Sequence, residues 1–327
     1  MEWVNLGRAG LKVSRLCLGT MTFGREADEA TSFRILDRYT ELGGCFIDTA
    51  DMYSVGGSEE VVGRWLKQRG NREAIVLATK VWAVMGPGPN DGGLSRMHIQ
   101  SAVEASLRRL QTDVIDLYQI HRWDASVPPE ETLETLNDLV RQGKVRYIGA
   151  SNLRAWQLAE YQHLAERHHW SRFVSIQPLF NALNRNIENE LLPYAARAGI
   201  GVITYNPLAG GMLTGKYRPG EPLPQGTRLE AFQSYYERYY AEAALELAGK
   251  FVQAARERGV TPAQLALAWV MADPRVTCPI LGARSVEQLE DTIIGAELKL
   301  SAEERAAIPA VLPGRWVGRD PYVDYGL

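Results

Sequence analysis

Short apolar segments alternate with longer amphipathic segments along most of the chain. Each short segment is rich in apolar and β-branched residues, a composition typical of a buried strand. The predicted strands are Leu16–Gly19, Cys45–Ile47, Ile75–Lys80, Val114–His121, Val145–Gly149, Phe173–Gln177, Gly201–Tyr205 and Thr277–Leu281. Strands separated by helical segments pair in parallel through right-handed crossovers. Eight such units favour closure into a barrel over an open sheet.

The segments between the strands carry apolar residues at helical spacing. Positions three and four residues apart lie on one face of a helix, as with Ile99, Val103, Leu107 and Leu110, and with Leu133, Leu136 and Val140. Gly143 then predicts a helix end. Capping-box patterns that begin at Thr261, Ser285 and Ser301 predict three further helix starts. The pattern predicts an α/β fold of the (β/α)8 TIM-barrel type, with residues 1–327 forming a single domain.

Three regions interrupt this alternation. Trp3–Leu6 and Leu11–Val13 flank residues 7–10, which contain two glycines, and predict an N-terminal β-hairpin. The segments Ala83–Arg96, after strand three, and Leu208 to about Tyr236, after strand seven, are rich in glycine and proline. Long βα loops in compact domains are usually functional lids or disordered segments. Because both predicted loops follow the carboxyl ends of strands, we favour lids.

Composition and charge exclude several classes of protein. The chain is 46% hydrophobic and 23% charged, which is ordinary for a globular protein with a large core. A net charge of −3 and a pI of about 6.0 give no basic excess for binding nucleic acid or an anionic membrane. The N-terminus lacks signal-peptide features, and the longest apolar run, Leu265–Ala272, is too short to span a bilayer. We therefore expect a cytoplasmic location.

Cysteine and histidine usage gives no sign of a metal site. Cys17, Cys45 and Cys278 lie in predicted strands and form no C-x-x-C pair, so buried reduced thiols are favoured over a redox or metal role. The five histidines show no H-x-x-x-H or H-E-x-x-H spacing, and His168-His169 lies on a polar helix. We predict no metal.

Three consecutive predicted strands deliver reactive side chains to one rim. Asp48 stands where strand two ends, and Tyr53 lies on the loop beyond it. Lys80 and His121 end the next two strands. Parallel α/β folds place reactive groups at these strand ends. Singly, each residue is more often structural: a cap, rim packing, a solvent-facing cation or a satisfied histidine. Together and in order, they favour a catalytic site.

The same positions carry a family resemblance. The matching phrases are Leu18-Gly19-Thr20-Met21, Asp48-Thr49-Ala50-Asp51-Met52-Tyr53, Thr79-Lys80, His121-Arg122-Trp123-Asp124, Gly149-Ala150-Ser151-Asn152, Gln177 and Gly282-Ala283-Arg284. In these phrases the chain resembles the aldo-keto reductases, (β/α)8 barrels that reduce carbonyls with NADPH. The branch most similar contains bacterial members and potassium-channel β-subunits. The resemblance also guides the placement of the weaker strands, so the count of eight depends partly on it.

The resemblance implies that Asp48, Tyr53, Lys80 and His121 are the catalytic residues. Tyrosine has a reference pKa near 10 and alone is a reluctant acid at neutral pH. A nearby lysine cation favours the phenolate and lowers that pKa. Tyr53 would then be the general acid, Lys80 would tune it, and Asp48 would hold the lysine charged and in place. His121 would orient the carbonyl oxygen by donating a hydrogen bond.

The cofactor site is not of the Rossmann or P-loop type. Residues 19–24 lack the spacing of a G-x-G-x-x-G motif, and residues 210–217 resemble a P-loop but have Tyr217 where Ser or Thr binds magnesium. We therefore reject ATP. The resemblance implies that this loop instead covers the pyrophosphate of the cofactor. Arg284, just before a predicted helix start, would bind the 2′-phosphate, which favours NADPH/NADP+ over NADH.

The resemblance implies further cofactor contacts along the rim. Ser151, Asn152 and Gln177 would hold the nicotinamide amide, and Tyr205 would stack on its ring. Asp291-Thr292 departs from the Glu-Asn pair common in the family, which leaves the adenine contacts open. The predicted contacts are Gly19, Thr20, Met21, Asp48, Ser151, Asn152, Gln177, Tyr205, Asn206, Pro207, Leu208, Gly210, Gly211, Lys216, Gly282, Arg284, Gln288 and Asp291.

The predicted partner is a small-molecule carbonyl substrate, with self-association into a homo-oligomer left open. Its expected contacts are Tyr53, Trp82, His121 and Trp123. The two tryptophans wall an apolar pocket or, equally well, pack at the rim. Asp51 is interpreted as loop structure.

Two other functions are weighed against reduction. One is a regulatory subunit that binds NADPH and turns over slowly, as the channel β-subunits suggest. The other is a lyase in which Lys80 forms a Schiff base.

Overall fold

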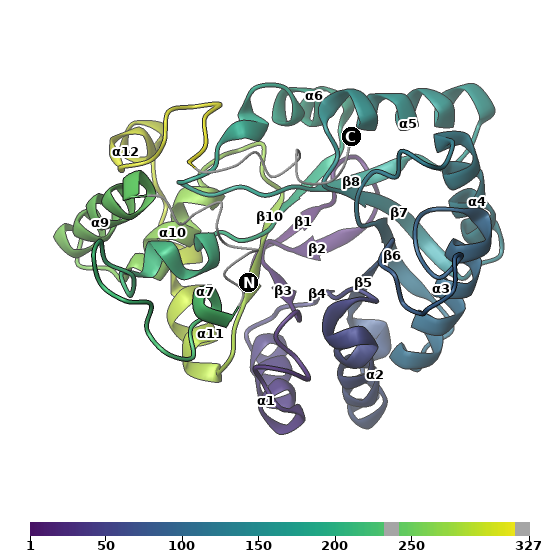
Figure 1. Ribbon diagram of the computed structural model, residues 1–327, viewed down its shortest axis with the longest axis horizontal. Helices are drawn as coiled ribbons and strands as arrows, with labels where there is room; N and C mark the ends of the chain where they lie inside the picture. The colour runs from purple at the N-terminus through teal and green to yellow at the C-terminus, as the bar shows by residue number, and fades with distance from the viewer. Residues whose placement is uncertain (232–241, 318–327) are drawn as a thin grey trace.

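The structure is a computed structural model that describes residues 1–231 and 242–317. Its centre is a closed barrel of eight parallel strands ringed by helices (Figure 1). Around the barrel the order is β10-β3-β4-β5-β6-β7-β8-β9. The barrel strands are β3 (Cys17–Gly19), β4 (Phe46–Asp48), β5 (Val76–Val81), β6 (Ile115–Ile120), β7 (Val145–Ser151), β8 (Phe173–Gln177), β9 (Gly201–Thr204) and β10 (Cys278–Gly282). The predicted (β/α)8 barrel is confirmed.

The helices lie outside the barrel, and most of them bury apolar side chains, whereas the short α12 buries none. They are α1 (Glu29–Glu41), α2 (Gly57–Arg69), α3 (Arg96–Leu110), α4 (Pro129–Arg141), α5 (Ala155–His168), α6 (Leu191–Ala198), α7 (Arg228–Ala231), α9 (Glu242–Glu257), α10 (Pro262–Met271), α11 (Val286–Ile293) and α12 (Ala302–Ala307). Short 3-10 helices add η1 (Tyr53–Gly56), η2 (Arg72–Ala74), η3 (Asn186–Glu188), η4 (Ala209–Thr214) and η6 (Ile294–Glu297). The larger hydrophobic core fills the layer between strands and helices.

The predicted strand limits hold to within one or two residues. The largest extension is at β7, which was expected to end at Gly149 but continues to Ser151, because Ala150 and Ser151 remain paired with Ile176 and Gln177 of β8. Conversely, Tyr205 was placed in a strand, whereas β9 ends one residue earlier. Both changes fall at the carboxyl ends of strands, where the predicted site lies.

The N-terminal hairpin is confirmed as β1 (Trp3–Asn5) and β2 (Lys12–Ser14), an antiparallel pair. In Figure 1 it lies across the middle of the ring of strands. Leu6 and Val13 are fully buried in the smaller core, which fills the barrel interior together with Cys17, Phe46 and Cys278. The hairpin thus closes one end of the barrel and leaves the other end for the site.

The first long loop is irregular up to the start of α3, whereas the second contains short helices. The first runs up to Ser95, which caps α3 by accepting a hydrogen bond from the His98 amide. The second was predicted as loop from Leu208 to about Tyr236, but it contains η4 and α7. Its last part, residues 232–236, lies outside the described residues. The helices arise where the chain packs back on the core: Met212, Leu213 and Leu229 are buried.

Two of the three predicted capping boxes are confirmed. Thr261 and Ser301 each exchange reciprocal hydrogen bonds with the residue three positions on. At Ser285 only one of the two predicted capping-box hydrogen bonds forms, so that prediction was wrong in part. Its hydroxyl accepts from the Gln288 amide, but the Gln288 side chain accepts from the Arg284 amide instead of the Ser285 amide. The φ of Ser285 is −149°, whereas Thr261 and Ser301 have φ of −71° and −68°, so the Ser285 amide is oriented differently from the amides of the two complete boxes.

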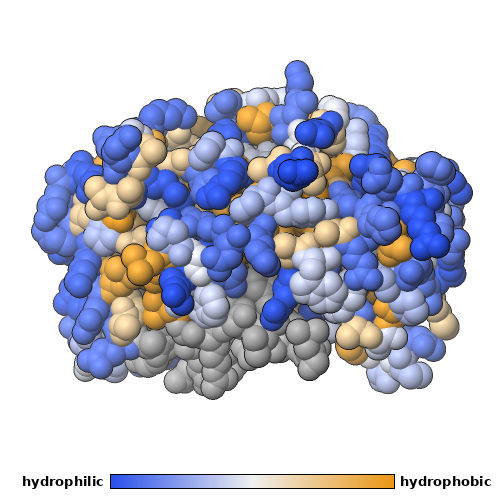
Figure 2. Space-filling model, turned by 90° about the horizontal axis from the view of Figure 1, so that it is seen from above, coloured by the Kyte–Doolittle hydropathy of each residue, from blue (hydrophilic) through white to orange (hydrophobic). Residues whose placement is uncertain are grey.

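The face shown in Figure 2 is mainly hydrophilic, with small separate apolar patches. Scattered apolar side chains of this kind are normal on a protein surface. In the described residues, no helix combines the length and hydropathy needed to cross a membrane.

Candidate active site

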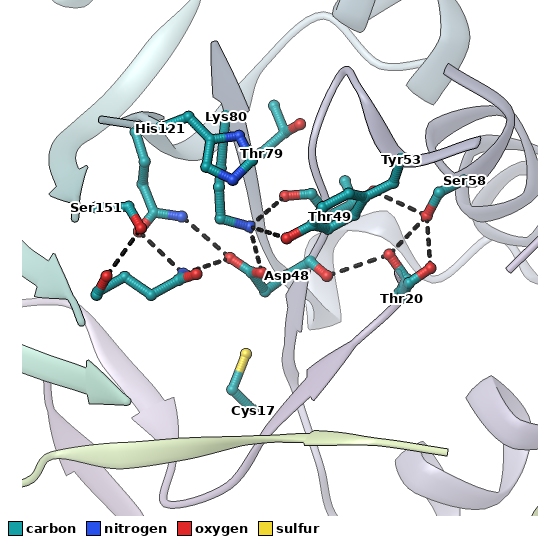
Figure 3. Close-up of polar contacts among 12 residues, drawn as sticks. Cys17, Thr20, Asp48, Thr49, Tyr53, Ser58, Thr79, Lys80, His121 and Ser151 are labelled. Carbon is teal, nitrogen blue, oxygen red and sulfur yellow. Dashed lines mark hydrogen bonds and ion pairs between the residues drawn. The ribbon is translucent and has the colours of Figure 1, made fainter. Parts of the chain in front are cut away.

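Strand ends bring the four predicted catalytic residues together at the open end of the barrel. Asp48 ends β4, and Lys80 is the penultimate residue of β5. His121 directly follows β6, and its amide still donates to the Val81 carbonyl, 2.8 Å away. Tyr53 begins η1, in the turn after β4. Figure 3 shows their side chains converging on the Lys80 ammonium from three neighbouring strands.

Lys80 is the centre of this arrangement. Its side chain is fully buried, and Nζ donates to Asp48 Oδ2 at 2.5 Å, to the Thr49 carbonyl at 2.8 Å and to the Tyr53 hydroxyl at 3.3 Å. These three bonds use all the donors of an ammonium group. Burial alone would lower the pKa of Lys80, but the charge of Asp48 and the hydrogen bonds of Asp48 and Tyr53 outweigh it and raise that pKa. Lys80 is therefore a cation next to the Tyr53 hydroxyl.

Asp48 is held from its other side by two amides. Its Oδ1 accepts from Gln177 Nε2 at 2.8 Å and from Gln119 Nε2 at 3.0 Å. Gln119 was not singled out in the sequence. A signal for it existed, because alternation along β6 places Gln119 on the same face as His121. With these bonds the buried carboxylate is fully partnered, and the Lys80 ammonium has a fixed position.

His121 lies edge-on to Tyr53, with ring centroids 6.0 Å apart and an interplanar angle of 79°. Its Nδ1 is buried and has no hydrogen-bond partner among the described residues. Burial first, and then the charges of Lys80 and Arg122, lower the pKa of His121 well below its usual value. His121 is therefore a neutral imidazole, which carries one ring N–H donor and one acceptor.

Four predicted nicotinamide contacts form one hydrogen-bonded group beside His121. Ser151 Oγ donates to the Gln177 carbonyl at 2.8 Å. Asn152 Nδ2 donates to Ser151 Oγ and to the His121 carbonyl, both at 3.0 Å. The Tyr205 hydroxyl donates to Asn152 Oδ1 at 2.9 Å. The amide groups and the aromatic ring thus lie within one group, and their contact with a nicotinamide stays a prediction.

The loop after β9 forms a tight series of turns. Asn206 Oδ1 accepts from the Gly210 amide at 2.6 Å. Gly210 and Gly211 have φ of 67° and 93°, the left-handed region that favours glycine. A Cβ on Gly211 would lie 2.8 Å from Lys216 Nζ, so this glycine lets the lysine cation cross the loop. Pro207 and Leu208 lie in the same turns, before η4.

Arg284 joins the two loops predicted to hold phosphate. Its Nη1 donates to the Gly226 carbonyl of the β9 loop at 3.2 Å, and its amide donates to Gln288 at 3.1 Å. Gly282, two residues earlier, is exposed. A cation therefore stands at the amino end of α11, where partial positive charge also gathers.

The remaining predicted cofactor residues have structural partners. The Asp291 carboxylate accepts from Gln264 Nε2 at 2.8 Å and from Thr261 Oγ1 at 3.2 Å, which ties α11 to the start of α10. Thr20 Oγ1 donates to the Asp48 carbonyl at 3.1 Å. A Cβ on Gly19 would lie 2.5 Å from an Ile280 methyl group, so close packing requires glycine there. Met21, next to Thr20, is half-buried.

Aromatic side chains surround the predicted substrate side of the rim. The Arg122 guanidinium carbon lies 3.7 Å from the centroid of the Trp82 ring. Trp123 packs edge-on against Trp156 and Tyr161, each with ring centroids 5.5 Å away. Trp156 was missed in the sequence because it lies on α5, and its side chain is half exposed. Both predicted tryptophans are thus partly fixed by packing.

Chemistry outside this group is limited. Cys17, Cys45 and Cys278 are buried free thiols, and burial is the largest cause that raises the pKa of each. Such thiols react slowly, because the thiolate is the reactive form. Within residues 1–231 and 242–317, no cluster of His, Cys, Asp or Glu has the arrangement of a metal site.

Comparison with known proteins identifies the family. Residues 15–313 match the model of the aldo/keto reductase family. The chain is 43% identical to an uncharacterized oxidoreductase, YrpG, of Bacillus subtilis, over 96% of this chain and 97% of the relative. It is 39% identical to "Probable voltage-gated potassium channel subunit beta" of Arabidopsis thaliana, over 90% of each. It is 37% identical to the norsolorinic acid reductase of Emericella nidulans, over 93% of this chain and 80% of that relative.

The chain therefore belongs to the aldo/keto reductase family. It is an oxidoreductase, and its family membership supports a general aldehyde or ketone reductase activity. Members of this family generally bind nicotinamide cofactors.

Proposed function

We propose that this protein reduces aldehydes or ketones to alcohols with NADPH, with Tyr53 as the general acid. One observation carries the proposal: the Lys80 ammonium is hydrogen-bonded to Asp48 and to the Tyr53 hydroxyl at once. The His121 ring stands edge-on to the same tyrosine. This arrangement can donate a proton and stabilise the phenolate that remains.

The residues on the rim fit a phosphorylated nicotinamide cofactor. The Asn152 amide donates to the His121 carbonyl and the Gln177 amide donates to Asp48, while the Lys216 and Arg284 cations lie on the loops after β9 and β10. These cations suit a pyrophosphate and a further phosphate, which supports NADPH over NADH. When bound, NADPH would supply the hydride that is added to the carbonyl carbon.

The protein side chains then act on the carbonyl oxygen. Neutral His121 donates its ring N–H to this oxygen and fixes its direction. As charge develops on the oxygen, the Tyr53 hydroxyl transfers its proton to it. The resulting phenolate stays next to Lys80, whose charge is held in place by Asp48. The hydroxyl proton of the alcohol product therefore comes from Tyr53.

The test is NADPH oxidation with a panel of aldehydes, comparing wild type with Tyr53→Phe. We expect the variant to bind NADPH normally and to turn over about 10²–10⁴-fold more slowly, because only the proton donor is lost. Phe preserves the ring packing against His121. A variant with wild-type turnover would overturn the role of Tyr53.

A regulatory subunit with slow turnover is the second candidate, because one relative is named as a potassium channel β-subunit. Tight NADPH binding with no turnover of any carbonyl by wild type would favour it. A Schiff-base lyase is disfavoured, because it needs a neutral lysine, whereas Asp48 keeps Lys80 charged.

We also propose a cytoplasmic location. The support is that Cys17, Cys45 and Cys278 are buried free thiols, as expected in a reducing compartment. Fractionation of cells that produce the protein would test it.

A further inference from the structure

Behind the catalytic residues lies a second buried polar group, in the layer between the strands and the helices α2 and α3. Glu59 of α2 is fully buried, and its two oxygens accept from different partners. Thr79 Oγ1 donates to Oε1 at 2.5 Å, and Arg109 Nε donates to Oε2 at 2.7 Å. Thr79 precedes Lys80 in β5, so the two side chains leave the strand on opposite faces. This outer group therefore shares a strand with the catalytic lysine.

Asp51 lies in this layer without comparable partners. Its side chain is fully buried, yet neither carboxylate oxygen has a hydrogen-bond partner among the described residues. The Tyr118 hydroxyl, also fully buried, likewise has none within the described ranges. Buried polar groups normally find partners, and an unpaired buried charge is more costly than an unpaired neutral group. The catalytic mechanism gives Asp51 no role.

The neighbouring charges leave no cation for Asp51. The titratable and charged groups that act on it or share its layer are Glu59, Arg109, Lys80 and Tyr118. Arg109 is paired with Glu59, and the Lys80 ammonium is paired with Asp48. If Asp51 were ionised, the layer would contain two carboxylates and one guanidinium. A proton on Asp51 makes the group neutral.

The environment acts in the same direction. Burial, and next the charge of Glu59, raise the pKa of Asp51 to about 7. The nearby Met52 amide and the charges of Arg109 and Lys80 offset only part of this rise in the pKa of Asp51. Asp51 therefore holds its proton at neutral pH far more than an exposed aspartate does.

The turn that presents Tyr53 is held at both ends, at one by the backbone of β5 and at the other by Arg109 of the outer group. At one end, the Asp51 amide donates to the Lys80 carbonyl at 3.3 Å. At the other, the Arg109 side chain packs over Gly56, where an added Cβ would lie 2.8 Å from Arg109 Cδ. Between these anchors, the bond from Lys80 to the Tyr53 hydroxyl is also long, at 3.3 Å. A small shift of the turn would break it.

We propose that Asp51 is a positioning residue that acts as a neutral acid, and that loss of its proton draws the turn of residues 50–56 outward and separates Tyr53 from Lys80. This inference rests on the proposed role of Tyr53. An ionised Asp51 beside Glu59 gains most by moving toward water or by competing for Arg109. Either movement shifts Tyr53, two residues along the chain.

The experiment compares the pH dependence of turnover in wild type, Asp51→Asn and Asp113→Asn, at saturating NADPH and aldehyde. Asn has the shape of Asp without its titration, and Asp113 is an exposed aspartate that serves as the matched control. We expect wild type and D113N to lose turnover above about pH 7, approaching tenfold per pH unit. D51N should match them within about twofold at pH 6 and retain more turnover than they do between about pH 7 and 8, whereas a decline at higher pH that all three proteins share belongs to the proton of Tyr53.

Two outcomes would overturn the proposal. In the first, D51N declines with pH as wild type does, so that another group titrates. In the second, D51N is impaired equally at every pH, so that an ionised carboxylate is required. Should D51N fail to fold, infrared spectra of wild type still decide: the C=O stretch of a buried carboxylic acid must be present at about pH 6 and lost by about pH 9.

A stability measurement, which does not depend on turnover, separates this inference from the proposed function. The folded protein retains the Asp51 proton up to about pH 7, whereas an unfolded aspartate releases it near pH 4. Wild type should therefore lose stability relative to D51N as the pH rises from about 4 to about 7, and no further above that. If wild type reduces no carbonyl but shows this difference, the proposed function fails while the neutral Asp51 stands. A pH-independent difference would refute the neutral acid.

Discussion

The buried carboxylates on the two faces of β5 differ in whether a cation balances their charge. On the inner face, Lys80 and Asp48 form a closed set in which each charge is matched and Asp48 accepts two further amide bonds. On the outer face, Glu59 and Arg109 are matched in the same way, but Asp51 is added without a cation. All three carboxylates are buried, so the two faces differ chiefly in charge balance. A matched set fixes a geometry at all ordinary pH values, whereas an unmatched acid makes the geometry depend on a proton.

The largest effect is expected from breaking the inner set. Lys80→Met leaves the Asp48 carboxylate buried without its cation, which costs about 3–5 kcal/mol of unfolding free energy in comparable cases. Adding Asp48→Asn should recover much of this loss, because the uncompensated charge is then gone. Urea denaturation measures both variants, with the exposed Lys67→Met as control. Equal stability of the single and double variants would contradict a charge-balanced inner face.

Breaking the outer set should have a smaller effect. Arg109→Met leaves Glu59 and Asp51 without a cation, but the Arg109 side chain is 20% exposed, so water offsets part of the cost. We expect a loss of about 2 kcal/mol at pH 8 that shrinks at lower pH, where the carboxyl groups can take up protons. Denaturation at two pH values measures it, with the exposed neighbour Arg108→Met as control. A loss that does not vary with pH would mean that packing, and not charge, is what Arg109 provides.

The smallest expected effect is a change of activity with pH through His121, which lies on the inner side of the comparison. Burial and the cations Lys80 and Arg122 lower its pKa well below its usual value, so it should stay neutral where an ordinary histidine titrates, near pH 6.5. We expect kcat/KM to change less than about twofold for this reason between pH 5.5 and 7. NMR of 15N-labelled histidine, assigned with His121→Gln, would follow the ring directly. A His121 titration near pH 6.5 would show that the inner face is open to water.

The sequence was sufficient to predict what strand periodicity controls. Asp48, Lys80 and His121 could be placed on one rim because parallel strands end together, and the structure brings them and Tyr53 within contact of one another. The alternation of apolar and helical segments likewise predicted the barrel and its hairpin. Family resemblance supplied the roles, which periodicity alone does not specify.

What the sequence did not show depends on packing between distant segments. The sequence predicts loop structure at Asp51, and Asp51 does lie in a turn, but its complete burial depends on packing that the local sequence does not specify. The Gln288 side chain accepts from the Arg284 amide, where the φ of the N-cap Ser285 is −149° and not near −70° as at Thr261 and Ser301, a difference that a capping motif does not encode. Such features depend on contacts and dihedral angles that no local pattern specifies.

The pairing of β3 with β10, which closes the barrel, has a consequence for folding during synthesis. Gly19 of β3 pairs with Gly282 of β10, so one of the first strands to be synthesised closes the barrel only with the last. Until then both strands present unpaired edges, which are prone to pair with other chains. Contacts so distant in sequence also slow folding. We expect nascent chains to depend on a holding chaperone on the ribosome, and truncations that remove β10 to aggregate instead of yielding a smaller soluble barrel.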